Sequence, residues 1–319
     1  MDILAEVARA EPRIRPWILE TPLQHSASLS DGSGASVFLK LENLQHTGSF
    51  KARGAFSRLL ALSDEERARG VIAASTGNHG AAVAYAMRAL GIPGRVVVPG
   101  DADQAKVAAI RSLGAEVEVH GDDSAVSERH ARAAAAREGA TYVSPYNDPL
   151  VVGGQGTVGV ELARQISAAA AVYIALGGGG LLAGVATYLK SVWPGVQIIG
   201  ASPERSAVMI ESIRAGRILS LPSEPTLSDG TAGGVEDDAI TFAPCRTLAD
   251  ELVTVTEDEI GDAMRLMRRA HQATVEGAAG VAIAAAVRQR DRWRGGNIVV
   301  IVCGGNIAVG KQAAVFGAG

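Results

Sequence analysis

The sequence predicts an α/β fold in which twisted, mostly parallel sheets are flanked by helices. Short apolar runs alternate with segments of helical period along the chain, which is the pattern of βαβ units. The chain has 319 residues, 47% of them hydrophobic and only 4% aromatic, with 38 glycines. This length exceeds one ordinary core, and this composition suits strand-to-helix turns and Ala/Val/Ile packing. We therefore expect one large domain or two closely joined domains.

The apolar pattern places each expected element. Strands are expected at residues 36–41, 71–75, 95–98, 116–119, 172–176, 196–201 and 298–302. Helices are expected at residues 49–62, 78–90, 103–113, 124–138, 155–166, 181–191, 257–271 and 277–290. A Gly91-Ile92-Pro93 stop and a capping Asp103 support two of these boundaries. Residues 216–246 lack periodicity and are rich in Pro, Ser, Gly and Asp, so we expect a long loop that forms a wall of the active site.

Charge and cysteine content exclude several classes of protein. A net charge of -4 gives no broad electrostatic footprint for nucleic acid or an anionic membrane. The two cysteines, Cys245 and Cys303, cannot form a disulfide framework, and the six histidines lack HxxxH spacing, so no metal site is expected. The N-terminal residues lack the apolar stretch of a secretory signal, so we expect a cytoplasmic protein. Residues 165–189 carry no charge, but Gly177 to Gly180 interrupt them, which predicts a buried strand and helix instead of a membrane span.

One lysine follows a Gly/Ser turn, in the segment Thr47-Gly48-Ser49-Phe50-Lys51. The four other lysines lack such a turn: Lys40, Lys106, Lys190 and Lys311. Nearby cations can lower the pKa of a lysine that is held where a loop becomes a helix. Its amine can then be neutral, as Schiff-base formation requires. Taken alone, the same segment also fits a solvated lysine at a helix start.

A polar turn, Ser75-Thr76-Gly77-Asn78-His79-Gly80, follows the strand expected at residues 71–75. Backbone N–H groups at a helix start, beside hydroxyl and amide side chains, can bind a carboxylate. Ordinary capping of the helix by Thr76 or Asn78, and a structural role for His79, also fit the local pattern.

Two further turns follow expected strands. Gly177 to Gly180 can direct several amides at one phosphate, although they match neither GxGxxG with a ribose acid nor GxxxxGK[ST]; a plain tight turn is the alternative. The second turn is Cys303-Gly304-Gly305-Asn306. Its thiol can contact a ring nitrogen as a neutral hydrogen-bond partner, and the alternative is that Cys303 is a small buried hydrophobic residue. Because ligands collect beyond the carboxyl ends of parallel strands, we expect these turns to build one site.

Taken in order, the motifs resemble the fold-type II pyridoxal-5′-phosphate (PLP) enzymes, and specifically the threonine and serine dehydratases and serine racemase. The motifs are TGSFKARGA, STGNHG, GGQGT at 153–157, GGGG, SDG at 228–230, VEGAAG at 275–280, and CGGN. The resemblance runs nearly end to end. It implies a large PLP-binding domain of residues 1–69 plus 149–319 and a small domain of residues 70–148. It also implies a small amino acid as substrate and a homodimer.

The resemblance assigns a role to each site residue. Lys51 would form the Schiff base with PLP and remove the Cα proton of the substrate, after which the β-hydroxyl leaves and a 2-oxo acid and ammonia result. The cofactor-binding residues would be Phe50 against the ring, Lys51, Asn78 at the phenolic oxygen, Gly177, Gly178, Gly179 and Gly180 at the phosphate, Gly230 over the other ring face, Glu276 near the ring, and Cys303 at the pyridine nitrogen. The substrate carboxylate would fall to Ser75, Thr76, Gly77 and His79.

Two departures from the family pattern bear on the reaction. The racemases place a serine where this chain has Thr76, which makes racemisation a lesser expectation. Metal-stimulated relatives have a glutamate and an aspartate where this chain has Ser202 and Val208, so no divalent metal is expected.

Several functions remain open beside dehydration of threonine or serine. They are dehydration of a modified β-hydroxy amino acid such as phenylserine, hydroxyaspartate or a hydroxyectoine-derived compound, serine racemisation, and β-replacement as in cysteine synthase. A nucleotide-binding regulatory protein built on a parallel sheet is the alternative from outside the enzymes.

Overall fold

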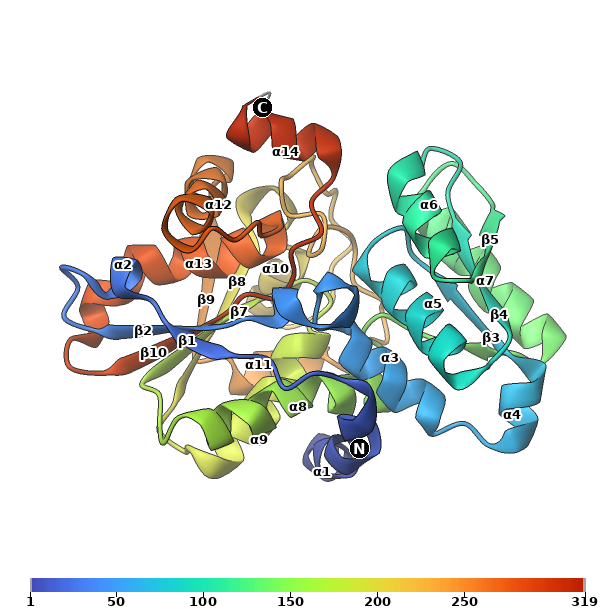
Figure 1. The fold of residues 1–319 in the computed structure, drawn as a ribbon, viewed down its shortest axis with the longest axis horizontal. Coiled ribbons are helices and arrows are strands. Elements are labelled where there is room, and N and C mark those ends of the chain that lie inside the picture. Colours follow the sequence, from blue (N-terminus) through green and yellow to red (C-terminus); the bar gives the residue numbers. More distant parts are fainter. Residues whose placement is uncertain (1, 318–319) are drawn as a thin grey trace.

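Two separate sheets organise residues 2–317, the part of the chain that this computed structural model describes (Figure 1). The larger sheet has the strand order β1-β2-β10-β7-β8-β9, and only β1 runs antiparallel to its neighbour. The smaller sheet is fully parallel, with the order β5-β4-β3-β6. The predicted fold class is therefore confirmed.

The strands of the larger sheet are β1 (Leu23–His25), β2 (Ser36–Lys40), β7 (Ala171–Ala175), β8 (Gln197–Pro203), β9 (Glu251–Val255) and β10 (Asn297–Ile301). The smaller sheet contains β3 (Val71–Ala74), β4 (Gly94–Val98), β5 (Glu116–Val119) and β6 (Thr141–Tyr142). Every strand that the sequence predicts is present, within three residues at either end. β1, β6 and β9 are additional.

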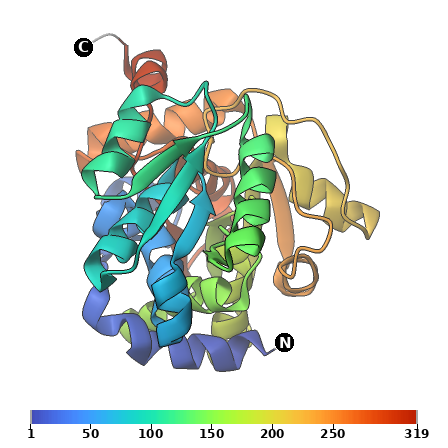
Figure 2. The same cartoon turned by 90° about the vertical axis from the view of Figure 1, so that its right-hand side faces the viewer.

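The helices lie on both sides of the sheets, and α1 and α14 are at opposite ends of the molecule in both views (Figures 1 and 2). The N-terminal half contains α1 (Ile3–Ile14), α2 (Ala27–Ser30), α3 (Lys51–Leu60), α4 (Asp64–Arg69), α5 (Asn78–Leu90), α6 (Gln104–Ser112), α7 (Ser124–Glu138) and α8 (Pro149–Gln165). The C-terminal half contains α9 (Gly180–Val192), α10 (Val208–Ala215), α11 (Phe242–Leu248), α12 (Glu257–His271), α13 (Gly277–Gln289) and α14 (Val309–Phe316).

Each sheet has its own buried apolar cluster. β7 is buried along its whole length and packs with α13, so it forms part of the core of the larger sheet. In the smaller sheet, α7 places Ala131 and Ala134 against Ile72 on one face, while α5 covers the other face. The helix α3 links the two parts, because it contacts α8 and also contributes Phe56 to the cluster of the smaller sheet.

The start of α8 corrects one predicted boundary. We expected this helix at residues 155–166, but it begins at Pro149, where the Asp148 side chain accepts hydrogen bonds from two backbone N–H groups. The glycines of its first turns lie inside the helix because neighbouring backbones approach closely there. A Cβ on Gly154 would lie 2.6 Å from the carbonyl oxygen of Arg53, and one on Gly156 would lie 2.9 Å from that of Gly184.

The expected long loop at residues 216–246 is interrupted by the start of α11 at Phe242. The uncharged segment 165–189 contains β7 and most of α9, as predicted. Within residues 2–317, no helix combines the length and the apolar character that crossing a membrane requires.

Candidate active site

A single cavity of about 1160 Å³ is lined by every residue that the sequence places in the site. It opens at the ends of β3, β7 and β10, as expected for ligand sites in parallel sheets. The predicted residues that it brings together are Phe50, Lys51, Ser75, Thr76, Gly77, Asn78, His79, Gly177, Gly178, Gly179, Gly180, Gly230, Glu276 and Cys303.

Lys51 is the first residue of α3, and its amine lies at the cavity. The Nζ atom donates a hydrogen bond to the carbonyl oxygen of Pro145 at 2.8 Å and lies 5.2 Å from the ring centroid of Phe50. Burial lowers the pKa of this amine to about 8, even though negative charge at Cys303 or Glu276 would raise it. A larger fraction of this amine is therefore neutral near neutral pH than for an ordinary solvated lysine.

The turn before α9 is a cradle that only glycine fits. A Cβ on Gly178 would lie 2.4 Å from the Tyr146 ring, and one on Gly177 would lie 2.8 Å from the Thr231 backbone. Gly179 has a φ of 85°, in the left-handed region, and no side chain caps the helix. Because no side chain caps this helix start, the N–H groups of the first turn of α9 can bind an anion. The Gly178 carbonyl accepts a hydrogen bond from the Thr241 hydroxyl, which helps to hold the turn.

The turn before α5 forms a second uncapped helix start at the same cavity. Gly77 is the capping residue, and neither Thr76 nor Asn78 caps the helix with its side chain, so the capping alternative is not observed. The Ser75 hydroxyl accepts a hydrogen bond from the Gly77 N–H at 3.1 Å and shapes the turn. A Cβ on Gly80 would lie 2.2 Å from the Ser75 carbonyl oxygen, which explains the glycine there. The cavity thus has two positions suited to anions.

The amide of Asn78, which the family resemblance directs at a cofactor oxygen, has two side-chain partners, and its cofactor contact stays a prediction. Its Nδ2 donates to both carboxylate oxygens of Glu276 at 2.8 Å, and its Oδ1 accepts from Asn306 Nδ2 at 2.7 Å. Burial raises the pKa of Glu276 to about 7, although the Asn78 hydrogen bond opposes this change. A Cβ on Gly304 would lie 2.3 Å from Glu276 Oε1, so only a residue without a side chain fits where the CGGN turn passes this carboxyl group.

The imidazole of His79 is held by a backbone acceptor. Its Nε2 hydrogen-bonds to the carbonyl oxygen of Val143 at 2.8 Å, and the residue is buried. Burial, together with the charge of Lys51, lowers the pKa of the ring to about 3, so the imidazole is neutral and Nε2 donates. The substrate contact of His79 stays a prediction, and with Nε2 engaged, its backbone N–H in the first turn of α5 is the group suited to it.

Cys303 lies at the end of β10 with only 2% of its surface exposed. Burial raises the pKa of its thiol well above the ordinary value, and the nearby Glu276 adds to this effect. The thiol is therefore neutral, as the sequence interpretation requires. On another wall of the cavity, Gly230 lies next to Ala278. A Cβ added to Gly230 would lie 3.1 Å from the Cβ of Ala278.

Several cavity residues were missed by sequence reasoning. Tyr146 closes over the glycine cradle, and its hydroxyl accepts a hydrogen bond from the Glu236 N–H at 2.9 Å. Asn306 donates to the Thr47 carbonyl as well as to Asn78, so it ties the lysine turn to α5. The CGGN motif could have suggested Asn306, whereas nothing in the local sequence distinguishes Tyr146.

The positions that hold carboxylates in metal-stimulated relatives form no such site. The Ser202 hydroxyl is buried and donates to the Leu176 carbonyl at 2.6 Å, and Val208 is a buried core residue. These two positions therefore offer no carboxylate ligand for Mg²⁺ or Ca²⁺.

Comparison with known proteins links this cavity to one family. The family described as "Pyridoxal-phosphate dependent enzyme" matches residues 14–304. The L-threonine ammonia-lyase of Thermotoga maritima is 39% identical over 309 residues, which cover 97% of this chain and 77% of that protein.

Solved structures show the same similarity. The processed form of threonine deaminase isoform 2 from Solanum lycopersicum has a TM-score of 0.93 and 36% identity, and the match covers 98% of this chain and 91% of that chain. Maize serine racemase has a TM-score of 0.91 and 32% identity, covering 98% of this chain and 95% of that chain.

Proposed function

The chain belongs to the family of pyridoxal-phosphate dependent enzymes, and from this premise we propose that it converts L-threonine, L-serine or a related β-hydroxy amino acid to a 2-oxo acid and ammonia. The water lost in the elimination is taken up again when the product imine is hydrolysed. One observation carries the proposal. A lysine amine with a pKa of about 8 shares a cavity with two uncapped helix N-termini. The names of the relatives, threonine ammonia-lyase and threonine deaminase, support the same reaction class.

The residues of the cavity fit PLP. The cradle of Gly177 to Gly180 suits the phosphate, since a Cβ at these positions would collide with its surroundings. Lys51 lies where it could hold the aldehyde carbon, with Phe50 beside its amine. Cys303 would present a neutral thiol to the ring nitrogen, and Gly230 would leave the other ring face open. When bound, PLP supplies an electron sink for negative charge at the substrate Cα.

The remaining steps belong to the side chains and backbone of the chain. The turn before α5 and the first residues of this helix, from Ser75 to His79, would bind the substrate carboxylate through backbone N–H groups at the helix start and the hydroxyls of Ser75 and Thr76. This anchor orients the Cα–H bond relative to Lys51. The neutral Nζ would take the Cα proton, because a base whose pKa lies near the working pH combines availability with proton affinity. A neutral contact at Cys303 favours elimination over transamination, since it does not stabilise a protonated pyridine.

The test is to measure 2-oxo acid and ammonia from a panel of L-threonine, L-serine, phenylserine and hydroxyaspartate. Lys51→Ala should abolish steady-state turnover, and borohydride reduction followed by peptide mass analysis should place the cofactor on Lys51. Lys190→Ala is the matched control, since Lys190 pairs with Asp250 outside the cavity. A cofactor adduct on another lysine, or near-normal turnover of Lys51→Ala, contradicts the proposal. A product only from phenylserine or hydroxyaspartate would instead select the dehydratase for a modified substrate.

Serine racemisation is the second candidate, because maize serine racemase shares the fold. Inversion needs a proton donor on the face opposite Lys51, and Thr76 occupies the position expected for it. The β-methyl group of Thr76 restricts its χ1 rotamers, which should slow proton delivery. We therefore expect pyruvate to exceed D-serine greatly when L-serine is supplied, and Thr76→Ser to raise the D-serine fraction. D-serine formed as fast as pyruvate by the unchanged enzyme would favour the racemase.

We also propose that the enzyme is a cytoplasmic homodimer in which residues 1–69 plus 149–319 form the PLP-binding domain and residues 70–148 form the small domain. The two sheets support this division, and the two free, buried cysteines are compatible with a reducing compartment. Light scattering after gel filtration tests the dimer, and limited proteolysis tests the domain boundaries.

A further inference from the structure

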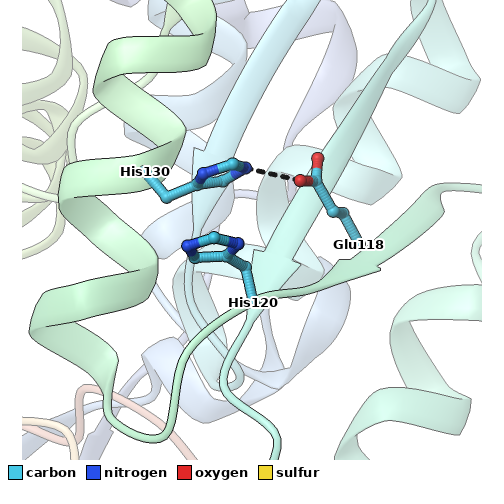
Figure 3. Close-up of side chains that lie close together, drawn as sticks. All are labelled: Glu118, His120 and His130. Atoms are coloured by element: carbon cyan, nitrogen blue, oxygen red, sulfur yellow. Dashed lines mark hydrogen bonds and ion pairs between the residues drawn. The ribbon is translucent and has the colours of Figure 1, made fainter.

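Two histidines and a glutamate meet on the small sheet, outside the cavity-lining residues (Figure 3). Glu118 lies near the end of β5, His120 follows this strand, and His130 lies on α7. Their ligand atoms all lie within 4.8 Å of one another. His130 Nε2 is 2.5 Å from Glu118 Oε1, and the His120 ring stacks on the His130 ring with centroids 3.6 Å apart.

A network around Glu118 holds its carboxylate in place. Arg95 Nε donates to Glu118 Oε2 at 2.5 Å, while both terminal nitrogens of Arg95 donate to Glu138 at 2.8 Å. The carboxylate of Glu138 shares the charge of Arg95 with Glu118, and the other oxygen of Glu118 is directed at His130. Such outer partners commonly orient metal ligands and raise metal affinity.

We propose that Glu118, His120 and His130 form a binding site for Zn²⁺ or a similar transition-metal ion. Zn²⁺ binds imidazole nitrogen and carboxylate oxygen at about 2.0–2.2 Å, so two ligand atoms on one tetrahedral ion lie roughly 3.3 Å apart. The three ligand atoms now lie within 4.8 Å of one another, and side-chain rotation can bring them to the distances that an ion requires. In this rotation the exposed His120 ring leaves its stack on His130 and turns a nitrogen toward the ion. Imidazole ligands favour zinc, nickel and copper over Mg²⁺ and Ca²⁺.

The ion would link β5 to α7 and stabilise one wall of the main cavity. Residues 120–123 connect the two elements, and the Ser127 hydroxyl donates to the His120 carbonyl at 2.7 Å. Ser124, Ser127 and Glu128, which follow this connection, line the cavity. Because binding to the folded state alone stabilises it, the site should raise the melting temperature of the small domain. This inference does not depend on the proposed reaction.

The test uses the full-length holoenzyme with Zn²⁺ as the probe, by isothermal titration calorimetry and by elemental analysis after gel filtration. One Zn²⁺ per chain should be retained by the unchanged protein and lost in the His120→Ala/His130→Ala double variant. Each single substitution should weaken binding at least about tenfold, since even changes to outer partners of a metal cost about 10–100-fold. His25→Ala is the matched control, because His25 is an exposed histidine on β1, away from this cluster.

Tm measured with and without Zn²⁺ gives a second readout. A rise is expected in the unchanged protein and in His25→Ala, and none in the double variant. The His120→Ala single variant keeps the test decisive if the double variant is misfolded, since His120 is exposed. Equal zinc retention by the unchanged protein and His120→Ala, or no zinc binding by the unchanged protein, overturns the proposal. Mg²⁺ should produce neither heat nor a Tm change at this site.

Discussion

The substitution Glu161→Gln tests the buried charge network behind the lysine helix. Glu161 on α8 is fully buried and accepts hydrogen bonds from Arg53 at 2.7 and 2.9 Å, from Lys40 at 2.6 Å and from Arg15 at 2.9 Å. It also accepts from the Thr21 N–H at 3.2 Å. A glutamine keeps the shape but removes the only charge at this position, and it turns an NH₂ group toward cations.

The pKa of Glu161 gives the magnitude of the loss. Burial acts to raise this pKa, but Arg53 and Lys40 outweigh it and lower the pKa from 4.5 to about 2. At about 1.36 kcal/mol per pKa unit, the ionised carboxylate contributes about 3 kcal/mol to the free energy of unfolding. Loss of one partner from a buried ion pair costs about 3–5 kcal/mol, which agrees. Because the folded-state pKa is the lower one, this contribution is complete above pH 4.5 and is lost as the pH falls toward 2.

Urea unfolding followed by circular dichroism provides the assay. At neutral pH, Glu161→Gln should lose about 3 kcal/mol relative to the unchanged protein, and the difference should stay constant down to about pH 4.5 and shrink below it. Glu65→Gln is the control, because the Glu65 side chain is 88% exposed and its loss should change stability by less than about 0.5 kcal/mol. A loss below about 1 kcal/mol for Glu161→Gln, or an equal loss for Glu65→Gln, would refute the reasoning.

Three further predictions concern the cavity and its surroundings. Gly178→Ala should lower the free energy of unfolding by about 1–3 kcal/mol and weaken PLP binding in a fluorescence titration, because the new Cβ would lie 2.4 Å from Tyr146. Gly195→Ala is the control and should be neutral, since a Cβ there meets no atom within 4 Å. Equal effects of the two substitutions would contradict the steric argument. Cys303→Ser should remain active and Cys303→Asp should lose activity, since only the second places an anion at the ring nitrogen; an equally active Asp variant would show that Cys303 does not contact the ring. Millimolar Mg²⁺ or Ca²⁺ should not raise the turnover of chelator-treated enzyme, because Ser202 offers no carboxylate; stimulation would reveal a ligand set elsewhere.

The elements that the sequence predicts well have either a continuous apolar run or clear end signals. β7 and β10 are buried on nearly all sides and consist almost entirely of apolar residues. α12 begins with the capping box of Thr256 and Glu259, and α5 ends at Gly91 in the left-handed conformation, so both match their predicted limits. β1 and β6 have three and two residues, too few to show a period. β9 could have been found, because Val253 and Val255 alternate with more exposed residues.

The sequence predicts the parts of the site that depend on backbone conformation. It does not predict the parts that depend on contacts between side chains far apart in the chain. Glycine turns after strands identify both helix starts that are suited to anions, because the carboxyl ends of parallel strands meet at one edge. The contact of Asn78 with Glu276 joins residues 198 positions apart, and no local pattern encodes it. The direction of the His79 side chain depends equally on a distant acceptor, the carbonyl of Val143. The group of Glu118, His120 and His130, for which we propose a metal ion, escaped the spacing argument because its members lie on β5, directly after it and on α7.

The comparison of Lys51 with Lys40 shows what the structure adds to a motif. Both amines have a pKa lowered by burial. Lys40 has a carboxylate and two other acceptors around its amine, namely Glu161 at 2.6 Å, the Thr21 carbonyl at 2.7 Å and Gln165 at 3.0 Å. These acceptors match the three donors of an ammonium ion, so Lys40 is held charged and immobile. Lys51 has the single Pro145 carbonyl at 2.8 Å and otherwise faces the cavity. An amine with a single hydrogen-bond acceptor can lose its proton and move, so this difference in acceptors, more than the Gly/Ser turn itself, supports our proposal that Lys51 is the reactive lysine.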